Sequence, residues 1–569
     1  MATTLRLLIS AAAITLASAV SAQEDGVAPI LRDLRPVTDE MLRQPAAGDW
    51  LHWRRTYDGW GYSPLDQIDR GNVGDLQLAW AWAMDPGTQV TTPLVHDGVM
   101  FLASPNSIIQ ALDAATGDLL WEFRDTVELP PVRKEVRGLS IHEDRIYLNT
   151  ADARIIAVDM RTGRKVWDTQ VADPDQGFRY SAASLVVRGK VISGLQNNRF
   201  WKEKNAVTAH DAATGEELWR TRTIALPGEP GGDTWGDVPA VFRAGADMWV
   251  TGGYDPELDL IYWSTAQAKP FTAAARGTDG DALYSNSTLA LDPDTGRIVW
   301  FRQWVPGEQH DMDEVFEHLL IDHDGRQSLF KMGKLGILWE ADRRTGEFIN
   351  AIDMGYQNLV DVDLATGTVT YRPEMIPELD RPMDHCPHIS GLHSWRAMAY
   401  HPEMQTLFFP LQLACNSIIY TNVEKVEGGG GVGIGAFRVF PHPDSGGNLG
   451  EFVAMDLSGE ILWKHRQRAT FNSTTLTTAG GLAFVGDWNR YIDAFDARTG
   501  DMLWQTRAAA SVQGGIISYA VAGRQYIAVI VGTGASSWSN QAPQGVTPEL
   551  KRPNHGNAVM VFALPAPPR

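Results

Sequence analysis

The two cysteines of this chain, Cys386 and Cys415, are the first residues whose types and spacing suggest chemistry. An oxidising compartment would favour a disulfide bond between them, and no other thiol competes. Three histidines near Cys386, namely His385, His388 and His393, offer a zinc site as the alternative. Structural zinc sites have regularly spaced ligands, so one thiol with irregularly spaced histidines is a poor match. We therefore predict the disulfide.

A glycine-rich stretch is the second candidate. Residues Gly428 to Gly433 formally match the pattern G-x-G-x-x-G. In dinucleotide-binding proteins this pattern follows a strand and opens a helix, and no such context surrounds it here. We interpret the run from Val423 to Gly435 as a flexible loop that leaves the main fold.

The elements that would position a site come from a repeated motif of a small residue, Asp, Gly and Trp. Each Asp-to-Gly step is a polar turn between two apolar runs, which predicts a strand, a tight turn and a second strand. A hairpin cannot bury its apolar face alone, so neighbouring copies must stack. Seven copies occur, with Asn at the Trp position of the fifth: Asp113 and Trp121, Asp159 and Trp167, Asp211 and Trp219, Asp292 and Trp300, Asp342 and Asn350, Asp456 and Trp463, and Asp496 and Trp504.

The spacing of these copies predicts eight units. The gap from Asp342 to Asp456 is long enough for two repeats, and the apolar stretch from Trp395 to Leu413 suggests a degenerate one. We expect an all-β fold, an eight-bladed β-propeller of four-stranded antiparallel blades. The runs 76–82 and 557–563 are expected to share one blade and close the ring, and the Trp residues to pack between blades.

The N-terminal residues predict export. Met1 to Ala22 contains Arg6, an apolar core from Leu7 to Leu16, and an A-x-A-like site before Gln23. This pattern is typical of a secretory signal peptide cleaved after Ala22, and it is too short to remain as a membrane span. We expect residues 23–569 to form a single propeller domain in the periplasm, with no membrane span.

The charge of the chain constrains its partners. The formal net charge is −20, and removal of the signal peptide with its one arginine makes it −21. Such an excess of negative charge repels nucleic acid and anionic lipid. It would attract a basic protein, such as a small electron carrier. No C-x-x-C-H motif is present, which excludes covalently attached haem on this chain.

Segments between the repeats carry a more specific signal. The segments 48–50, 62–76, 254–262 and 280–285 resemble signatures of the quinoprotein alcohol dehydrogenases, which bind pyrroloquinoline quinone (PQQ). Residues 36–40 look most like the sorbose/sorbosone dehydrogenase branch. The resemblance covers nearly the whole mature chain. It implies an enzyme that oxidises an alcohol, polyol or sugar hydroxyl, or an aldehyde, and passes electrons to a separate soluble acceptor such as a c-type cytochrome.

The same resemblance implies the catalytic residues. Asp311 matches the aspartate that accepts the substrate hydroxyl proton while hydride passes to the quinone. Lys334 matches the cation that hydrogen-bonds the quinone oxygens and stabilises the negative charge developing there. The alternative for Asp311 and Asp313 is a pair of solvated loop carboxylates. For Lys334 it is a surface lysine, which its apolar, strand-like surroundings disfavour.

The implied cofactor contacts complement a planar molecule with three carboxylates. Trp249 matches the tryptophan on which PQQ lies, and Arg137 and Ser181 match groups that bind its carboxylates. The full set of expected PQQ-binding residues is Arg137, Ser181, Asn197, Asn198, Trp249, Lys334, Ser394 and Trp395.

The metal ligands depart from the family pattern. The segment that holds the family's metal-binding Glu has no carboxylate here, and Gln267 replaces the metal-binding Asn. The resemblance leaves Gln267, Asp311, Asp313 and an amide of Asn197 or Asn198 as oxygen ligands. Ca²⁺ is the expected ion, with a lanthanide as the alternative because of Asp313. Pro131-Val132 also replaces the adjacent-cysteine disulfide of alcohol-oxidising relatives.

A non-catalytic periplasmic scaffold is the alternative function. The outer-membrane assembly lipoproteins share this repeat, but they carry a lipidated cysteine after the signal, which is missing here. Because Asp311, Lys334, Arg137 and Trp249 all match the enzyme family, we favour the enzyme.

Overall fold

The computed structural model describes residues 27–125, 135–534 and 538–565. The predicted signal peptide, residues 1–22, lies outside this part of the chain. The described residues form mainly strands, with four short α-helices: α1 (Pro29–Arg32), α2 (Asp39–Arg43), α3 (Ala273–Arg276) and α4 (Gln541–Val546). None of these described helices has the length and apolar character that a bilayer-crossing helix needs.

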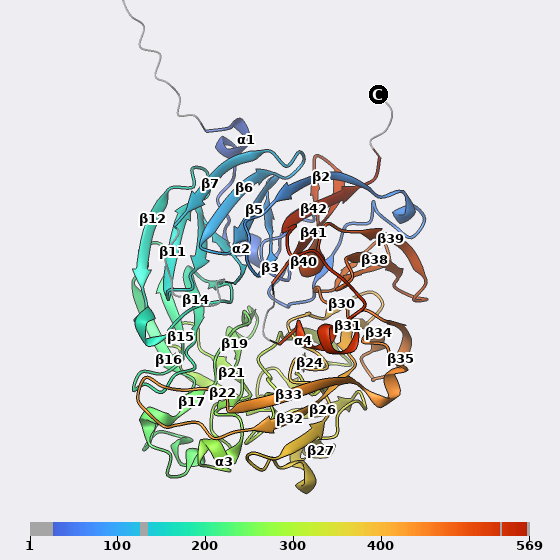
Figure 1. Cartoon of the computed structure of the whole chain (residues 1–569). Helices are drawn as coiled ribbons and strands as arrows, with labels where there is room; N and C mark the ends of the chain where they lie inside the picture. The colour runs from blue at the N-terminus through green and yellow to red at the C-terminus, as the bar shows by residue number, and fades with distance from the viewer. Residues whose placement is uncertain (1–26, 126–134, 535–537, 566–569) are drawn as a thin grey trace, which may run out of the picture.

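Eight sheets of four or five strands are present within the described residues, side by side around the centre of the molecule (Figure 1). The first four contain β4 (Leu94–His96), β5 (Val99–Ser104), β6 (Ile108–Asp113) and β7 (Leu119–Arg124); β9 (Ser140–His142), β10 (Arg145–Asn149), β11 (Arg154–Asp159) and β12 (Lys165–Gln170); β13 (Leu185–Val187), β14 (Lys190–Leu195), β15 (Ala206–Asp211) and β16 (Glu217–Arg222); and β18 (Gly253–Asp255), β19 (Leu260–Ser264), β21 (Ser287–Leu291) and β22 (Ile298–Gln303).

The other four sheets lie in the remaining part of the molecule in Figure 1. They contain β23 (Leu319–His323), β24 (Arg326–Met332), β25 (Ile337–Asp342) and β26 (Phe348–Asp353); β30 (Ala399–His401), β31 (Thr406–Gln412), β34 (Gly450–Asp456) and β35 (Ile461–Gln467); β1 (Tyr62–Ser63), β36 (Leu476–Thr478), β37 (Leu482–Gly486), β38 (Tyr491–Asp496) and β39 (Met502–Arg507); and β2 (Gln77–Ala83), β40 (Ser511–Val521), β41 (Arg524–Gly532) and β42 (Ala558–Ala563).

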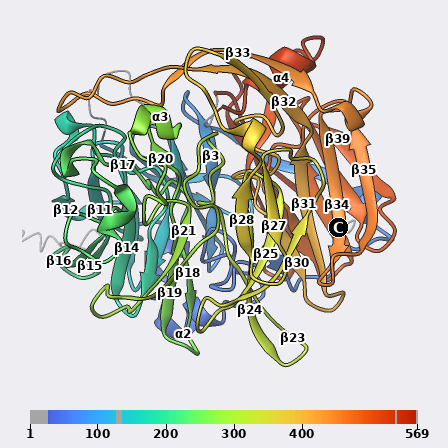
Figure 2. The same ribbon diagram turned by 90° about the horizontal axis from the view of Figure 1, so that it is seen from below.

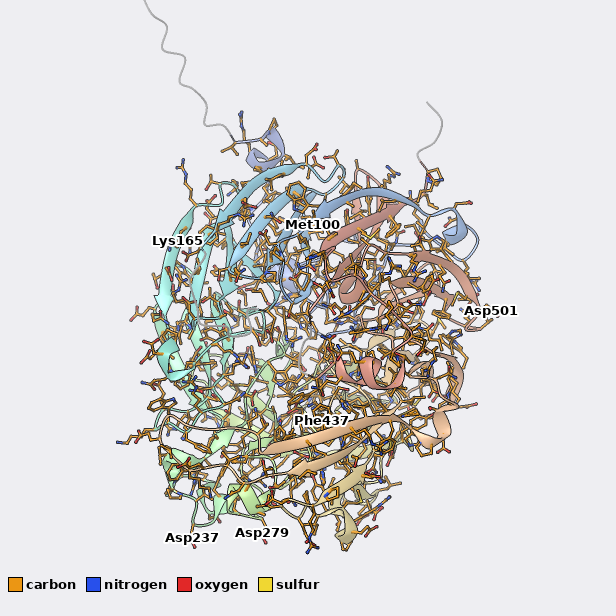
Figure 3. The ribbon with its side chains drawn as sticks, viewed as in Figure 1. Met100, Lys165, Asp237, Asp279, Phe437 and Asp501 are labelled. Carbon is orange, nitrogen blue, oxygen red and sulfur yellow. A yellow bond between two sulfur atoms is a disulfide. The ribbon has the colours of Figure 1, made fainter. Side chains whose placement is uncertain are left out.

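The hydrophobic core lies between neighbouring sheets. The inner strands of a sheet are buried on both faces, as β5 is, whereas the outermost strand β7 is partly exposed. Figure 3 shows the same contrast: Met100 is fully buried between sheets, and Lys165 and Asp501 are exposed at the rim. Strands buried on both faces bury much apolar surface per residue, which is the main stabilising contribution.

The predicted turns occur at the repeated Asp residues. Asp113 is the last residue of β6, and its carboxylate accepts hydrogen bonds from the backbone N–H groups of Ala115 at 2.8 Å and Thr116 at 3.1 Å. The N–H of Gly117 donates to the Asp113 carbonyl at 2.8 Å and closes the turn. The motif therefore forms the hairpin between the third and fourth strands of its sheet, as its composition predicts.

Each repeat tryptophan packs on the turn of the next sheet. Trp121 lies over Gly163, and its indole N–H donates to the Met160 carbonyl at 3.0 Å. Gly163 has a φ of +66°, and a Cβ there would lie 2.5 Å from Trp121 Cε3. The prediction of inter-sheet packing is confirmed. We call this contact the Trp–Gly seam; it recurs at Trp80 and Gly117, Trp167 and Gly215, Trp219 and Gly296, Trp300 and Gly346, and Trp463 and Gly500.

The prediction of a degenerate blade at Trp395–Leu413 is wrong. This stretch supplies β30 and β31, which pair with β34 and β35 in one sheet that already contains the Asp456 motif. The long gap holds inserted strands and not a further repeat. The sheet without the motif is built from the two ends of the chain, where β2 pairs antiparallel with β42, with Trp80 opposite Val561.

Some of the inserted strands cover one end of the molecule. The inserted strands are β27 (Val360–Asp363) with β28 (Thr368–Tyr371), and β29 (Pro382–His385) with β32 (Ala414–Tyr420) and β33 (Ile434–Pro441). Figure 2 shows β32, β33 and α4 on the same side, opposite α2, and Val439 of β33 packs against Ala542 and Val546 of α4. We call β29, β32, β33 and α4 the cap.

A disulfide joins two strands of the cap region. Cys386, directly after β29, is bonded to Cys415 in β32, which confirms the predicted pairing. The alternative zinc site is wrong, because the Cys386 thiol is consumed in the disulfide. One of its expected histidine ligands, His393, instead contacts Glu317 at 3.2 Å.

Candidate functional site

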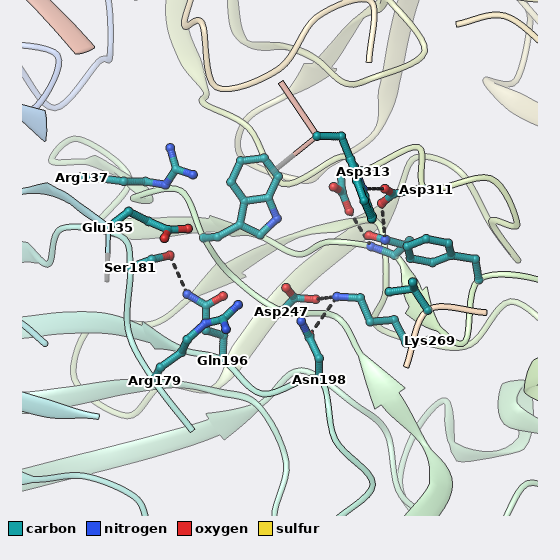
Figure 4. Close-up of a pocket in the computed structure, with 15 residues that line it drawn as sticks. Glu135, Arg137, Arg179, Ser181, Gln196, Asn198, Asp247, Lys269, Asp311 and Asp313 are labelled. Carbon is teal, nitrogen blue, oxygen red and sulfur yellow. Dashed lines mark hydrogen bonds and ion pairs between the residues drawn. The ribbon is translucent and has the colours of Figure 1, made fainter. Parts of the chain in front are cut away.

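A cavity of about 240 Å³ lies at the capped end of the molecule (Figure 4). Its walls come from short segments that precede or follow strands of the first five sheets, and from two segments of the cap region, at Val432 and Trp538. The lining residues are Glu135, Arg137, Arg179, Ser181, Gln196, Asn198, Asp247, Trp249, Gln267, Lys269, Phe271, Asp311, Asp313, Val432 and Trp538.

Asp311 lies in the segment between β22 and β23, and its carboxylate has three contacts. It accepts a hydrogen bond from Gln267 Nε2 at 2.5 Å and one from Trp538 Nε1 at 2.5 Å. The Lys334 ammonium lies 3.0 Å from Asp311 Oδ1. Asp311 is 3% exposed with a φ of +67°. It is therefore held in an uncommon backbone conformation, and it is not a solvated loop residue.

The backbone around Asp311 is anchored by a buried asparagine. Asn286 Nδ2 donates to the Met312 carbonyl at 2.9 Å, and its Oδ1 accepts from the Glu314 N–H at 3.2 Å. This pair of hydrogen bonds fixes the segment that carries Asp311 and Asp313. A segment held at both sides of one residue presents its carboxylates in a defined direction.

Lys334 connects the two carboxylates. It lies between β24 and β25, is fully buried, and places its ammonium 2.8 Å from Asp313 Oδ2 as well as beside Asp311. It also donates to the Asp311 carbonyl at 2.8 Å. The alternative that Lys334 is a surface residue is wrong.

The electrostatics of this cluster are set by burial. Burial raises the pKa of the Asp311 carboxyl above its usual value; the Lys334 ammonium opposes this shift, and the Asp313 carboxylate adds to it. For Lys334, burial alone would lower the pKa, but the charges of Asp311 and Asp313 raise it. Asp311 is consequently a stronger base than an exposed aspartate, next to a lysine that stays charged.

Trp249 forms a flat wall of the cavity. The residue is 9% exposed. The ring of Phe316 packs edge-on against the indole, with the two ring centroids 5.1 Å apart, and this contact fixes the orientation of the indole. The Arg137 guanidinium lies 5.0 Å from the centre of the indole. An aromatic face with a guanidinium beside it can bind a planar, anionic ligand.

Two further predicted residues lie on the cavity. Ser181 accepts a hydrogen bond from Gln196 Nε2 at 2.6 Å, and its carbonyl accepts one from the Arg137 N–H at 3.0 Å. Asn198 accepts a hydrogen bond from the Lys269 ammonium at 2.9 Å. These contacts place Ser181, Arg137 and Asn198 at one shared cavity.

Gln267 provides an oxygen suited to a cation. The side-chain oxygen Oε1 is buried and has no hydrogen-bond partner among the described residues. The backbone N–H of Gln267 donates to Asp313 Oδ1 at 3.3 Å. Unpartnered buried acceptors are costly. With the carboxylates of Asp311 and Asp313, this amide oxygen makes a set of hard oxygen donors that fits Ca²⁺ or a lanthanide.

Four of the predicted cofactor contacts are not among the residues that line this cavity: Asn197, Lys334, Ser394 and Trp395. Lys334 contacts the lining carboxylates of Asp311 and Asp313. Asn197 uses its side chain elsewhere, since Oδ1 accepts from the Arg199 N–H at 2.9 Å and Nδ2 donates to the Gln176 carbonyl at 3.0 Å. Ser394 is buried, and no described residue partners its hydroxyl. Trp395 packs in the same hydrophobic cluster as Trp249 and lines a small neighbouring cavity together with Arg137.

Several lining residues were not predicted from the sequence: Glu135, Arg179, Gln196, Asp247, Lys269, Phe271, Val432 and Trp538. Val432 belongs to the glycine-rich run that we expected to leave the fold. Instead its carbonyl accepts from the Phe271 N–H at 3.1 Å, and Gly430 bridges to Arg199. Glycine in that run allows a close approach of two backbones, because a Cβ at Gly430 would lie 2.7 Å from the Asn198 carbonyl oxygen.

Comparison with known proteins adds to this geometry. The family described as "Glucose/ethanol/alcohol dehydrogenase, beta-propeller domain", a PQQ family, matches residues 50–356 and 449–527. Quinohemoprotein alcohol dehydrogenase ADH IIB of Pseudomonas putida is 32% identical over 555 residues, covering 92% of this chain and 78% of that protein. Quinoprotein alcohol dehydrogenase PedH of Pseudomonas putida is 30% identical over 548 residues, or 89% of each chain.

A solved structure shows the same architecture. A europium-containing methanol dehydrogenase superposes with a TM-score of 0.85 at 26% sequence identity, covering 93% of this chain and 100% of that chain. None of these relatives is a sorbose or sorbosone dehydrogenase, so the expected placement in that branch is not supported.

Proposed function

The chain belongs to the PQQ-dependent alcohol dehydrogenase family, and we propose that the cavity around Asp311 is where it binds PQQ and oxidises its substrate. The observation that carries this proposal is the position of the Asp311–Lys334–Asp313 cluster. Asp311 and Asp313 line the same cavity as the Trp249 face and the Arg137 guanidinium, and the buried Lys334 ammonium contacts both carboxylates. A base, a fixed cation and a flat anion-binding wall therefore converge on one place.

The cavity walls fit the chemistry of PQQ. The indole of Trp249 would support its planar ring, Arg137 would pair with a carboxylate, and the Ser181 hydroxyl would hydrogen-bond another. When bound, PQQ supplies the two-electron acceptor for the hydride that leaves the alcohol carbon. Phe271, Val432 and Trp538 form the apolar part of the lining, where the carbon chain of an alcohol would lie.

The residues of the chain supply the proton transfer. The Asp311 carboxylate accepts the proton of the substrate hydroxyl as the C–H bond breaks, so that the alcohol becomes a carbonyl compound. Gln267 and Trp538 orient that carboxylate through their hydrogen bonds. The Lys334 ammonium stabilises negative charge beside it throughout the reaction.

We propose that Gln267, Asp311 and Asp313 hold a metal ion. Ca²⁺ fits their oxygen donors, and Asp313 adds the second carboxylate that would favour a lanthanide. The amide of Asn197 points elsewhere, and that of Asn198 is engaged by Lys269. The ion would therefore have fewer protein ligands than the sequence predicts.

Three further proposals concern the closure of the fold, the location of the protein and its electron acceptor. We propose that the eight sheets form a closed eight-bladed ring; the β2–β42 pairing and the seam between Trp80 and Gly117 support this closure. We also propose that the signal peptide directs the protein to the periplasm. Electrons would then pass to a separate acceptor such as a c-type cytochrome, because both cysteines are paired with each other and cannot bind haem.

Reconstitution tests the proposed function. Apo-protein should gain quinone absorbance and a higher melting temperature when PQQ is added with Ca²⁺ or La³⁺, since a ligand of the folded state stabilises it. A dye-linked assay with alcohols, polyols, sugars and aldehydes would then identify the substrate class. Absence of PQQ binding at micromolar concentration with every metal would contradict the proposal.

A further inference from the structure

A buried ion pair in the cavity has no part in the proton transfer described above. The Lys269 ammonium contacts the Asp247 carboxylate and donates to Asn198 Oδ1 at 2.9 Å. The side chains of Lys269 and Asp247 are only 6% and 5% exposed, and all three residues line the cavity (Figure 4).

The pair is positioned by a small sheet. Lys269 ends β20 (Ala268–Lys269), which pairs antiparallel with β17 (Ala244–Gly245), so that Ala244 lies opposite Lys269. Asp247 lies two residues after the end of β17, and its carbonyl accepts from the Ala266 N–H at 2.9 Å. Both charged residues are thus held by paired backbone segments, and the position of the ammonium is preset.

The Lys269 ammonium has one more N–H donor than it has hydrogen-bond acceptors among the described residues. A lysine ammonium carries three N–H donors, and Asp247 and Asn198 accept from it. Because Lys269 lines the cavity, its third N–H is available to a ligand there. A buried cation with a free donor is suited to an anionic oxygen, since charge-assisted hydrogen bonds are among the strongest.

We infer that Lys269 is a cofactor-binding residue of this chain, whose ammonium donates to an anionic oxygen of PQQ and carries part of the charge compensation otherwise supplied by the metal ion. This inference rests on the proposed function, because it requires PQQ in this cavity. Asp247 is its positioning residue.

The same ammonium weakens the metal site. It donates a hydrogen bond to Asn198 Oδ1, so that this oxygen is no longer available as a metal ligand. It also places a positive charge in the same cavity as the metal ion. Like charges in a poorly solvated cavity repel strongly. PQQ binding should therefore be partly independent of metal, and metal affinity should rise when the ammonium is removed.

The test compares PQQ affinity with and without metal. Apo-protein is titrated with PQQ in EDTA and in saturating Ca²⁺, with tryptophan fluorescence as the readout. Wild type should bind in EDTA, and Lys269→Met should bind about 10–100-fold more weakly there, the usual effect of losing a hydrogen bond to a charged group. The loss should be smaller in Ca²⁺, and Ca²⁺ itself should bind Lys269→Met more tightly. Lys269→Arg should restore most of the affinity in EDTA.

Two control variants make the result interpretable. Lys165→Met removes an exposed rim lysine and should bind PQQ as wild type does. If the uncompensated Asp247 carboxylate unfolds Lys269→Met, the double variant Lys269→Met/Asp247→Asn removes both charges and should show the same loss of affinity.

Three outcomes would overturn the inference. The first is wild-type affinity in EDTA of folded Lys269→Met or of the double variant Lys269→Met/Asp247→Asn, and the second is that the wild-type protein binds PQQ only when Ca²⁺ is present. In both cases PQQ still binds, so the proposed function stands and only the role of Lys269 is wrong. The third is no PQQ binding by wild type with any metal, which contradicts both.

Discussion

Two buried contacts of the described residues differ in how often they occur. The packing of Trp121 on Gly163 is repeated between other sheets, whereas the contact of Lys334 with Asp311 and Asp313 is not. The Trp–Gly seam recurs between neighbouring sheets with the same tryptophan edge and the same left-handed glycine. Among the described residues the cavity cluster occurs once, and its members come from separate segments of the chain. A repeated contact can tolerate a variant copy, whereas each residue of a unique site has no substitute.

The fifth copy illustrates that tolerance. Asn350 stands where the other copies have Trp, and the side chain of Ile352 lies over Gly459 in place of an indole. The sheets still pack, because an aliphatic group fills the space above the turn. The seam therefore depends on volume and on the glycine backbone, and not on one residue type.

The largest effect is expected from Asp311→Asn. The amide keeps the shape of the carboxylate but cannot accept a proton from the substrate hydroxyl. Turnover of the PQQ-loaded enzyme should fall by about 10²–10⁴, the usual effect of losing a general base. Steady-state kinetics with a dye acceptor measures this. Asp281→Asn, at an exposed position outside the cavity, is the matched control. Near wild-type turnover of Asp311→Asn with loss in Asp281→Asn would place the base elsewhere.

The next effect concerns the cap. The Cys386–Cys415 bond spans 29 residues, and a loop of that length contributes about 3–4 kcal/mol through the restricted unfolded chain. The double variant Cys386→Ser/Cys415→Ser should lower the free energy of unfolding by about that amount. Urea denaturation with and without reductant measures it. Reductant should destabilise wild type alone; equal sensitivity of the variant would show that the effect is not due to this bond.

A seam should respond to one methyl group. Gly163→Ala places a Cβ against the fixed Trp121 ring at a φ of +66°, and the combined clash and strain should cost about 2–3 kcal/mol. Gly459→Ala, whose added Cβ meets the flexible end of Ile352 at 2.7 Å, should cost less. Thermal unfolding of the two variants compares them directly. A greater loss in Gly459→Ala would contradict the importance of the indole ring in the seam.

The smallest effect comes from a buried carboxylate within a single sheet. Burial raises the pKa of Asp493, in β38, to about 6, so the folded state holds its proton more tightly than the unfolded chain does. The carboxylate therefore destabilises the protein as pH rises from about 4 to 6, and the penalty persists above that. Asp493→Asn should be more stable by about 1–2 kcal/mol at pH 7 and show no gain below about pH 4. Melting temperatures across this range measure it, and PQQ binding should not change.

The hairpins and the Trp–Gly seam were predicted from repeat spacing, whereas some of the cavity residues were predicted from family resemblance. The Asp, Gly and Trp spacing sufficed for the hairpins because each turn is stabilised locally, as at Asp113. It failed at Trp395–Leu413 because the cap insertion separates two strands of one sheet, and spacing cannot show which strands pair. Asp311 and Lys334 were predicted only through family resemblance, and the structure brings them together.

The unpredicted cavity residues share a physical reason. Lys269, Asp247 and Trp538 lie on short segments with no periodic pattern, and their meeting depends on how distant segments fold together. Lys269 stands two residues after Gln267, so a charged residue that close to an expected metal ligand was a signal that could have been followed.

The pairing of β2 with β42 has a consequence for how the molecule is made. Strands Gln77–Ala83 and Ala558–Ala563, far apart in sequence, share one sheet. During synthesis β2 emerges early and must wait without its partner until β42 has left the ribosome. An incomplete chain therefore carries an open sheet edge, and exposed edges are where chains associate wrongly. Emergence of β42, and not completion of any earlier repeat, is the event that ends this exposure.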